Sequence, residues 1–168
     1  ILYGRYFAED DFAALKIPLV VSATNLNAGK TTFFSSGPLI KAVMASTAVP
    51  VIFDPVRIDN QCYIDGGILN NLPVEPLIGY VDKIIGVNCN PVSDNYVTGN
   101  MRSLLERSLL MAINVNSYSK RSICDLFLEA PDLKVFGGFD FKKAQAIFDV
   151  GYEYGKSIVP LIKDLRPL

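Results

Sequence analysis

The chain has 168 residues, half of them hydrophobic, and a formal net charge of −1. This size and composition fit one globular domain with room for a hydrophobic core, and the near-neutral charge excludes the basic footprint that is typical of nucleic-acid binding. The sequence contains no histidine, so neither a Ser-His-Asp nor a Cys-His catalytic arrangement can be completed within it.

The three cysteines are widely spaced and do not form a metal-binding pattern. Cys62, Cys89 and Cys124 lie in apolar or strand-like sequence. Such positions are typical of buried free thiols and favour a reducing compartment such as the cytoplasm. No apolar run approaches the roughly 18 residues that a transmembrane helix requires. We therefore expect neither a metal site nor a membrane-spanning helix in this sequence.

The first regular elements predicted are two strands. Residues 18–26 (PLVVSATNL) and 30–36 (KTTFFSS) are rich in β-branched and aromatic residues, and they flank the turn residues Asn27-Ala28-Gly29. Because the connection is so short, the two strands are expected to form an antiparallel hairpin.

A helix and a short strand follow this hairpin. Residues 38–46 (PLIKAVMAS) favour a helix, since Pro38 suits the first helical position. A short strand is expected at residues 62–65. Asn71 is expected to cap a short helix that begins near Pro73.

The second half of the chain alternates between strands and helices. Residues 83–89 form an apolar run typical of a strand buried on both faces, and 123–130 predict another strand. Apolar stripes at helical spacing predict helices over 101–113 and 144–158, with Pro160 kinking or splitting the end of the second. This alternation predicts an α/β architecture in which helices cover a mainly parallel sheet.

Residues 27–33 (NAGKTTF) partly match a phosphate-binding loop. The full pattern G-x-x-x-x-G-K-[ST] requires glycine at the position of Thr24. The pattern must also run from a strand into a helix, whereas Lys30 opens a predicted strand. A hairpin turn with a solvated lysine is therefore predicted here.

The stretch YIDGGILNNLP (63–73) places a single carboxylate, Asp65, at the end of an apolar run and directly before Gly66 and Gly67. One interpretation is a plain Asp-Gly turn, because glycine accepts positive φ. The other is that the glycines let a chain segment or a substrate approach the backbone closely. The local sequence leaves both interpretations open.

Three stretches follow one another in this part of the chain: IPLVVSATNLNAGKTTFFSSG, AVMASTAVPVIF and YIDGGILNNLPVEPL. Their most specific parts are Ala45-Ser46-x-Ala48-x-Pro50, and Asp65-Gly66-Gly67 followed by Asn71-x-Pro73. In this order and spacing they resemble the second half of a patatin-like acyl hydrolase domain. The resemblance is strongest over residues 15–88. It implies a three-layer α/β/α fold with a mainly parallel central sheet that is incomplete here, residues 1–168 being the C-terminal part of a single domain.

In patatin-like enzymes the aspartate of such a motif pairs directly with a nucleophilic serine in G-x-S-x-G, with no histidine between them. The resemblance implies that Asp65 is the general base of a Ser-Asp dyad and that Gly66 and Gly67 belong to the active-site loop. The implied activity is phospholipase A-like hydrolysis of lipid acyl esters. A lipid or ester substrate, transient contact with a membrane surface and no metal or organic cofactor are implied with it.

The chain departs from the family pattern at the nucleophile. It contains no G-x-S-x-G and no early glycine-rich oxyanion loop, and Ser35, Ser36 and Ser46 lack the elbow context. We therefore expect the serine to lie in a segment before Ile1, and this chain by itself to be catalytically inactive. The alternative is a catalytically inactive patatin-fold module that binds lipid or a partner protein.

Overall fold

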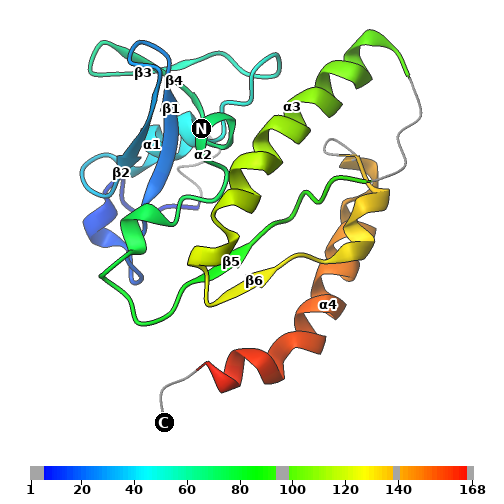
Figure 1. Cartoon of the computed structure of the whole chain (residues 1–168). Coiled ribbons are helices and arrows are strands. Elements are labelled where there is room, and N and C mark those ends of the chain that lie inside the picture. The colour runs from blue at the N-terminus through cyan, green and yellow to red at the C-terminus, as the bar shows by residue number, and fades with distance from the viewer. Residues whose placement is uncertain (1–5, 94–98, 138–140, 166–168) are drawn as a thin grey trace. The chain divides into compact units, whose positions relative to one another are not determined.

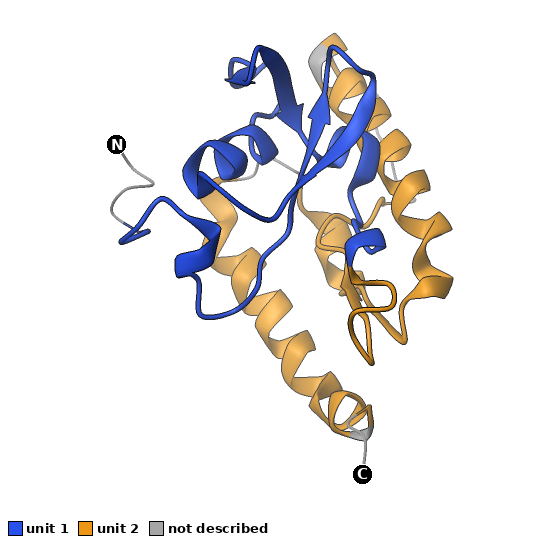
Figure 2. Cartoon of the chain, turned by 90° about the vertical axis from the view of Figure 1, so that its left-hand side faces the viewer, with its two compact units in different colours: residues 1–76 blue, residues 77–168 orange. Residues whose placement is uncertain are grey.

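A computed structural model describes residues 6–93, 99–137 and 141–165 (Figure 1). The chain divides into two compact units, Ile1–Pro76 and Leu77–Leu168, which Figure 2 shows in different colours. Each unit has its own sheet and its own helices, so each is considered by itself.

The first unit contains a four-stranded sheet in the order β2-β1-β4-β3, in which every neighbouring pair of strands is antiparallel. Helix α1 and the short helix α2 accompany it. A 3-10 turn lies at Phe12–Ala14, and another, Glu75–Leu77, crosses the boundary at which the unit ends. The bounds are β1 Val21–Asn25, β2 Lys30–Phe34, α1 Leu39–Ser46, β3 Val56–Ile58, β4 Gln61–Asp65 and α2 Gly67–Asn70.

The predicted hairpin is confirmed by the pairing of β1 with β2. At its turn the side chain of Asn25 accepts hydrogen bonds from the backbone N–H groups of Asn27 and Ala28, both at 2.9 Å. Gly29 closes the turn with a φ of 61°, which glycine adopts without strain. Lys30 then opens β2, so the segment that partly matched a phosphate-binding loop connects two strands.

The core of the first unit lies between α1 and the sheet. Leu39, Ala42 and Ala45 are fully buried on one face of α1. Ala45 packs in one cluster with Ala23 of β1 and Tyr63 of β4. The small alanines let the helix lie close to the sheet, and they thereby fix β1 and β4, the two central strands, against one rigid support.

The second unit contains one pair of parallel strands, β5 (Ile85–Val87) and β6 (Leu126–Leu128). The chain passes from β5 to β6 through α3 (Met101–Ser119), as a parallel pair requires a long crossover. Helix α4 (Ala144–Asp164) follows. Among the described residues of this unit, 3-10 turns also lie at Arg121–Ile123, Pro131–Val135 and Phe141–Lys143.

Polar side chains, of which Asn88 and Asn114 are buried, join α3 to the ends of the parallel strands. The amide of Asn88 donates to Asn114 at 3.0 Å and to the carboxylate of Glu129 at 2.6 Å. The Tyr118 hydroxyl donates to the same carboxylate at 2.8 Å. Every polar group in this network has a partner, which makes it a structural link between helix and sheet.

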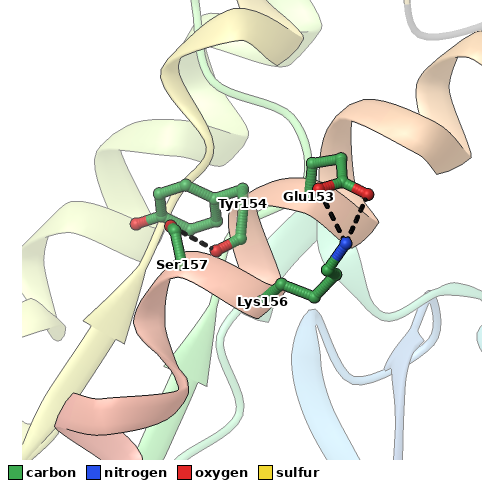
Figure 3. Close-up of polar contacts among 4 residues, drawn as sticks. All are labelled: Glu153, Tyr154, Lys156 and Ser157. Atoms are coloured by element: carbon green, nitrogen blue, oxygen red, sulfur yellow. Dashed lines mark hydrogen bonds and ion pairs between the residues drawn. The ribbon is translucent and has the colours of Figure 1, made fainter.

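The sequence predicts that Pro160 kinks or splits the end of its helix. Helix α4 continues through Pro160 to Asp164, so the proline does not split it. The polar contacts drawn in Figure 3 are local to this helix: Lys156 pairs with Glu153 at 2.9 Å, and Ser157 donates to the carbonyl of Tyr154 at 2.7 Å. Contacts between residues three apart support a helix surface and do not form a ligand site.

The α/β class is confirmed. The described strands form an antiparallel sheet and a separate parallel pair, in place of one mainly parallel sheet, because the connections β1–β2 and β3–β4 are too short for anything but hairpins. The strand predicted at 83–89 is present, but Ile85 and Val87 remain 41% and 56% exposed in the described structure. The helix expected to start near Pro73 with Asn71 as its cap is wrong: α2 begins earlier, at Gly67, and Asn71 follows its last residue.

Val51 has a φ of 73° and is 93% exposed, in the loop between α1 and β3. A β-branched residue in the left-handed region is strained by about 1–2 kcal/mol. Val51→Gly should relieve this strain and raise the free energy of unfolding. The gain should be about 1 kcal/mol or less, because glycine also adds chain entropy to the unfolded state, which opposes it. Denaturant unfolding measures the change.

Val81→Gly is the matched control, since Val81 is also an exposed valine in a loop but has an ordinary negative φ. It should lose stability through the entropy effect alone. Equal losses in both variants would show that Val51 is not strained.

Candidate active site

Asp65 is the last residue of β4, and its backbone is held from two sides. Its N–H donates to the carbonyl of Ala48, in the segment after α1, at 3.0 Å. Its carbonyl accepts from the hydroxyl of Thr24 in β1 at 2.9 Å. The residue therefore sits at a rigid strand end and not at the tip of a loose loop.

The carboxylate of Asp65 is half-buried and has one defined hydrogen bond. Its Oδ1 accepts from the N–H of Gly67 at 2.7 Å. Burial raises the pKa of Asp65 above the usual value for an aspartate, and the Gly67 hydrogen bond opposes that rise. A carboxylate whose pKa is raised in this way is a stronger base than one in free solution.

Gly66 is required by the close approach of a neighbouring strand. Its φ of −64° is an ordinary helical value, so the position does not need glycine for its backbone conformation. A Cβ at residue 66 would lie 2.3 Å from the carbonyl oxygen of Ser22 and 2.7 Å from its hydroxyl. At Gly66 the structure therefore supports the second interpretation of the glycine pair, in which a chain segment approaches the backbone closely.

Gly67 lies against the carboxylate itself. A Cβ there would stand 3.0 Å from Oδ1 of Asp65 and 2.9 Å from the side-chain oxygen of Asn71. The absence of a side chain lets the N–H of Gly67 reach the carboxylate at the start of α2. Helix α2 has four residues, which is about one helical turn.

The short helix is fixed to the segment that follows it. Asn70 is 4% exposed, and its amide donates to Glu75 at 3.0 Å. This hydrogen bond spans the end of α2 and the next 3-10 turn. It therefore fixes the end of α2 to the segment that follows.

The sequence singled out Ser35, Ser36 and Ser46, and the structure shows where each of them lies. Ser35 and Ser36 are exposed in the four-residue connection between β2 and α1, and Ser46 is the last residue of α1. None of the three lies in a G-x-S-x-G sequence. Ser46 ends a helix as expected, whereas Ser35 and Ser36 lie beyond the end of β2 and not within the strand predicted at 30–36.

Within residues 6–93, 99–137 and 141–165 there is no group of three or more His, Cys, Asp or Glu side chains that could hold a metal ion. Over the same ranges, no helix combines the length and hydrophobicity needed to cross a membrane. Cys62 and Cys124 are half-buried free thiols, but Cys89 is exposed, which differs from the burial expected for it.

Comparison with known proteins bears on the first unit above all. Residues 2–78 match the family model described as patatin-like phospholipase. An uncharacterized NTE family protein of Mycobacterium tuberculosis is 43% identical over 77 residues, which is 45% of this chain and 21% of that protein. Residues 2–78 are therefore similar to patatin-like phospholipases.

Weaker similarity extends over nearly the whole chain. A lysophospholipase of Aspergillus terreus is 24% identical over an alignment covering 95% of this chain and 12% of that protein. The human patatin-like phospholipase domain-containing protein 6 is 25% identical, over 92% of this chain and 13% of its own length. The chain therefore spans about a fifth or less of the length of these relatives.

Gly66→Ala should destabilise the first unit by about 1–3 kcal/mol, because the added methyl group meets the backbone of β1, which cannot move without disturbing the sheet. The change in the midpoint of denaturant unfolding measures it. Gly151→Ala in α4 is the control, since nothing lies within 4 Å of a Cβ there. It should gain up to about 1 kcal/mol from helix propensity. A neutral Gly66→Ala would contradict the close approach.

The raised pKa of Asp65 predicts how stability depends on pH. Because the folded state binds the proton more tightly than the unfolded state, the stability associated with protonated Asp65 is full below its unfolded pKa and is lost as pH rises through the folded pKa. Asp65→Asn removes this loss of stability, because asparagine does not ionise. The variant should therefore exceed the wild type in stability at neutral pH, and the difference should shrink as pH falls toward 3.8, the usual aspartate value. A difference that does not change with pH would contradict the raised pKa.

Proposed function

We propose that the chain is part of a lipid acyl-ester hydrolase in which Asp65 is the general base for a serine outside these 168 residues. The single observation that carries the proposal is how Asp65 is held. Its backbone is bonded on both sides and Gly67 engages Oδ1, while no hydrogen bond among the described residues engages Oδ2. The carboxylate is thus fixed in direction, with one oxygen available to a hydroxyl group.

The electrostatics of Asp65 suit the proposed step. A serine hydroxyl attacks an ester efficiently only when a base takes its proton in the transition state. Asp65 would take that proton as the serine oxygen bonds to the acyl carbon, and would return it to the leaving alcohol as the ester bond breaks. It would then take a proton from a water molecule as the water oxygen bonds to the acyl carbon, and would return that proton to the serine oxygen as the acyl–serine bond breaks and the acid is released. Burial favours the steps in which Asp65 takes a proton, because it strengthens the base.

The proposed substrate class is supported by the names of similar proteins. Relatives carry the names lysophospholipase and lipid hydrolase. We extend to this chain the coarser property, which is hydrolysis of a carboxylic ester in a lipid. Such substrates reside in membranes or micelles, so transient contact with a lipid surface belongs to the proposal. In the same proposal, residues 1–168 are the C-terminal part of one patatin-like domain and are inactive alone.

Asp65→Asn in the full-length protein should lower the rate of hydrolysis of a short-chain ester by roughly 10²–10⁴-fold, the usual effect of removing a positioned base. The substitution keeps the shape of the side chain and an oxygen that can accept from Gly67. We therefore expect the fold to survive, which circular dichroism checks. The rate of ester hydrolysis is the measurement.

Asp54→Asn is the matched control, because Asp54 is an exposed aspartate in the same unit. It should leave the rate unchanged.

A serine-reactive fluorophosphonate should label the full-length protein and not the 168-residue chain. If Asp65→Asn kept more than half of the activity, Asp65 would not be the base. If the folded full-length protein bound lipid but neither hydrolysed ester nor took up the probe, the chain would belong to a binding module.

A further inference from the structure

We propose that Thr24 is a positioning residue for Asp65, which it orients through a hydrogen bond between its hydroxyl and the Asp65 carbonyl. This inference rests on the proposed function, because it assigns to Thr24 a role in placing the proposed base. Thr24 lies in β1, the strand beside β4, and is separated from Asp65 by 41 positions in the sequence.

The hydrogen bond is short and shielded from water. The Thr24 hydroxyl donates to the carbonyl oxygen of Asp65 at 2.9 Å, and Thr24 is only 4% exposed. A water molecule cannot readily replace a donor at such a position, since Thr24 is almost fully buried. The contact is therefore stronger and more directional than a hydroxyl bond on the surface.

The bond acts at the place where regular strand pairing stops. Asp65 pairs with Ala23 as the last rung of the β1–β4 ladder, and the next residue, Gly66, already has helical backbone angles. The peptide between Asp65 and Gly66 is thus the pivot between strand and helix. The Thr24 hydroxyl holds the oxygen of that peptide.

The orientation of this peptide bears on the carboxylate. Gly67 N–H lies one peptide further along and donates to Oδ1 of Asp65 at 2.7 Å. If the pivot peptide tilts, the Gly67 N–H moves relative to the carboxylate and the direction of the free oxygen changes with it. Thr24 thereby connects the body of the sheet to the aim of the proposed base, although it does not touch the carboxylate.

Thr24→Val removes the hydroxyl and keeps the branched shape. In the full-length protein it should lower kcat for a short-chain ester by roughly 10- to 100-fold, the cost of a small misplacement of a reacting group, with KM nearly unchanged. It should also speed hydrogen exchange at the Gly67 amide. Thr24→Ser restores a hydroxyl and should recover most of kcat and the slow exchange.

Thr32→Val is the matched control: it is the same change in the neighbouring strand β2, at the position that pairs with Ala23. It should leave kcat and Gly67 exchange as in the wild type. Should Thr24→Val fail to fold, Thr24→Ala, which adds no bulk, takes its place. Circular dichroism establishes folding for each variant.

The outcomes separate the two proposals. If Asp65→Asn abolishes hydrolysis but Thr24→Val has a wild-type kcat, Thr24 is not a positioning residue and the proposed function stands. The same conclusion follows if Thr24→Ser fails to restore kcat, or if Thr32→Val lowers kcat as much as Thr24→Val does. If Asp65→Asn is as active as the wild type, both the proposed base and its positioning by Thr24 are overturned.

Discussion

The close packing of β1 against the turn that follows β4 is the constraint on which the candidate site depends. The carbonyl of Ser22 approaches Gly66 so closely that a Cβ would lie 2.3 Å away. Because Gly66 has no Cβ, the chain can pass this close to β1 and go from β4 into α2 without a wider loop. The same approach brings Thr24 and Asp65 within hydrogen-bond distance, so one steric requirement places both.

The body of the first unit supplies the rigidity that this turn needs. Ala45 of α1 and Ala23 of β1 are completely buried, and Tyr63 of β4 packs with them. Close packing of small side chains leaves little room for the strands to shift. The segment that leaves α1 then contributes the carbonyl of Ala48 to the backbone of Asp65. The helix thus both supports the sheet and fixes the residue at its end.

The electrostatic state of Asp65 is a balance between two opposing effects of that packing. Partial burial removes water from the carboxylate and raises its pKa, whereas the N–H of Gly67 stabilises the charged form. Burial is the larger effect. A side chain that is exposed enough to meet a partner and buried enough to be a stronger base suits acid–base chemistry better than a solvated turn residue.

Local patterns in the sequence determined the elements and the position of the candidate base. The hairpin at Asn27-Ala28-Gly29, helix α1 and the carboxylate at the end of a strand all follow from short-range preferences. The tertiary structure alone decided that β1 also pairs with β4, where α2 begins, and why residue 66 is glycine. Those features depend on contacts between residues far apart in the chain, such as Thr24 with Asp65, and local preference carries no information about such contacts.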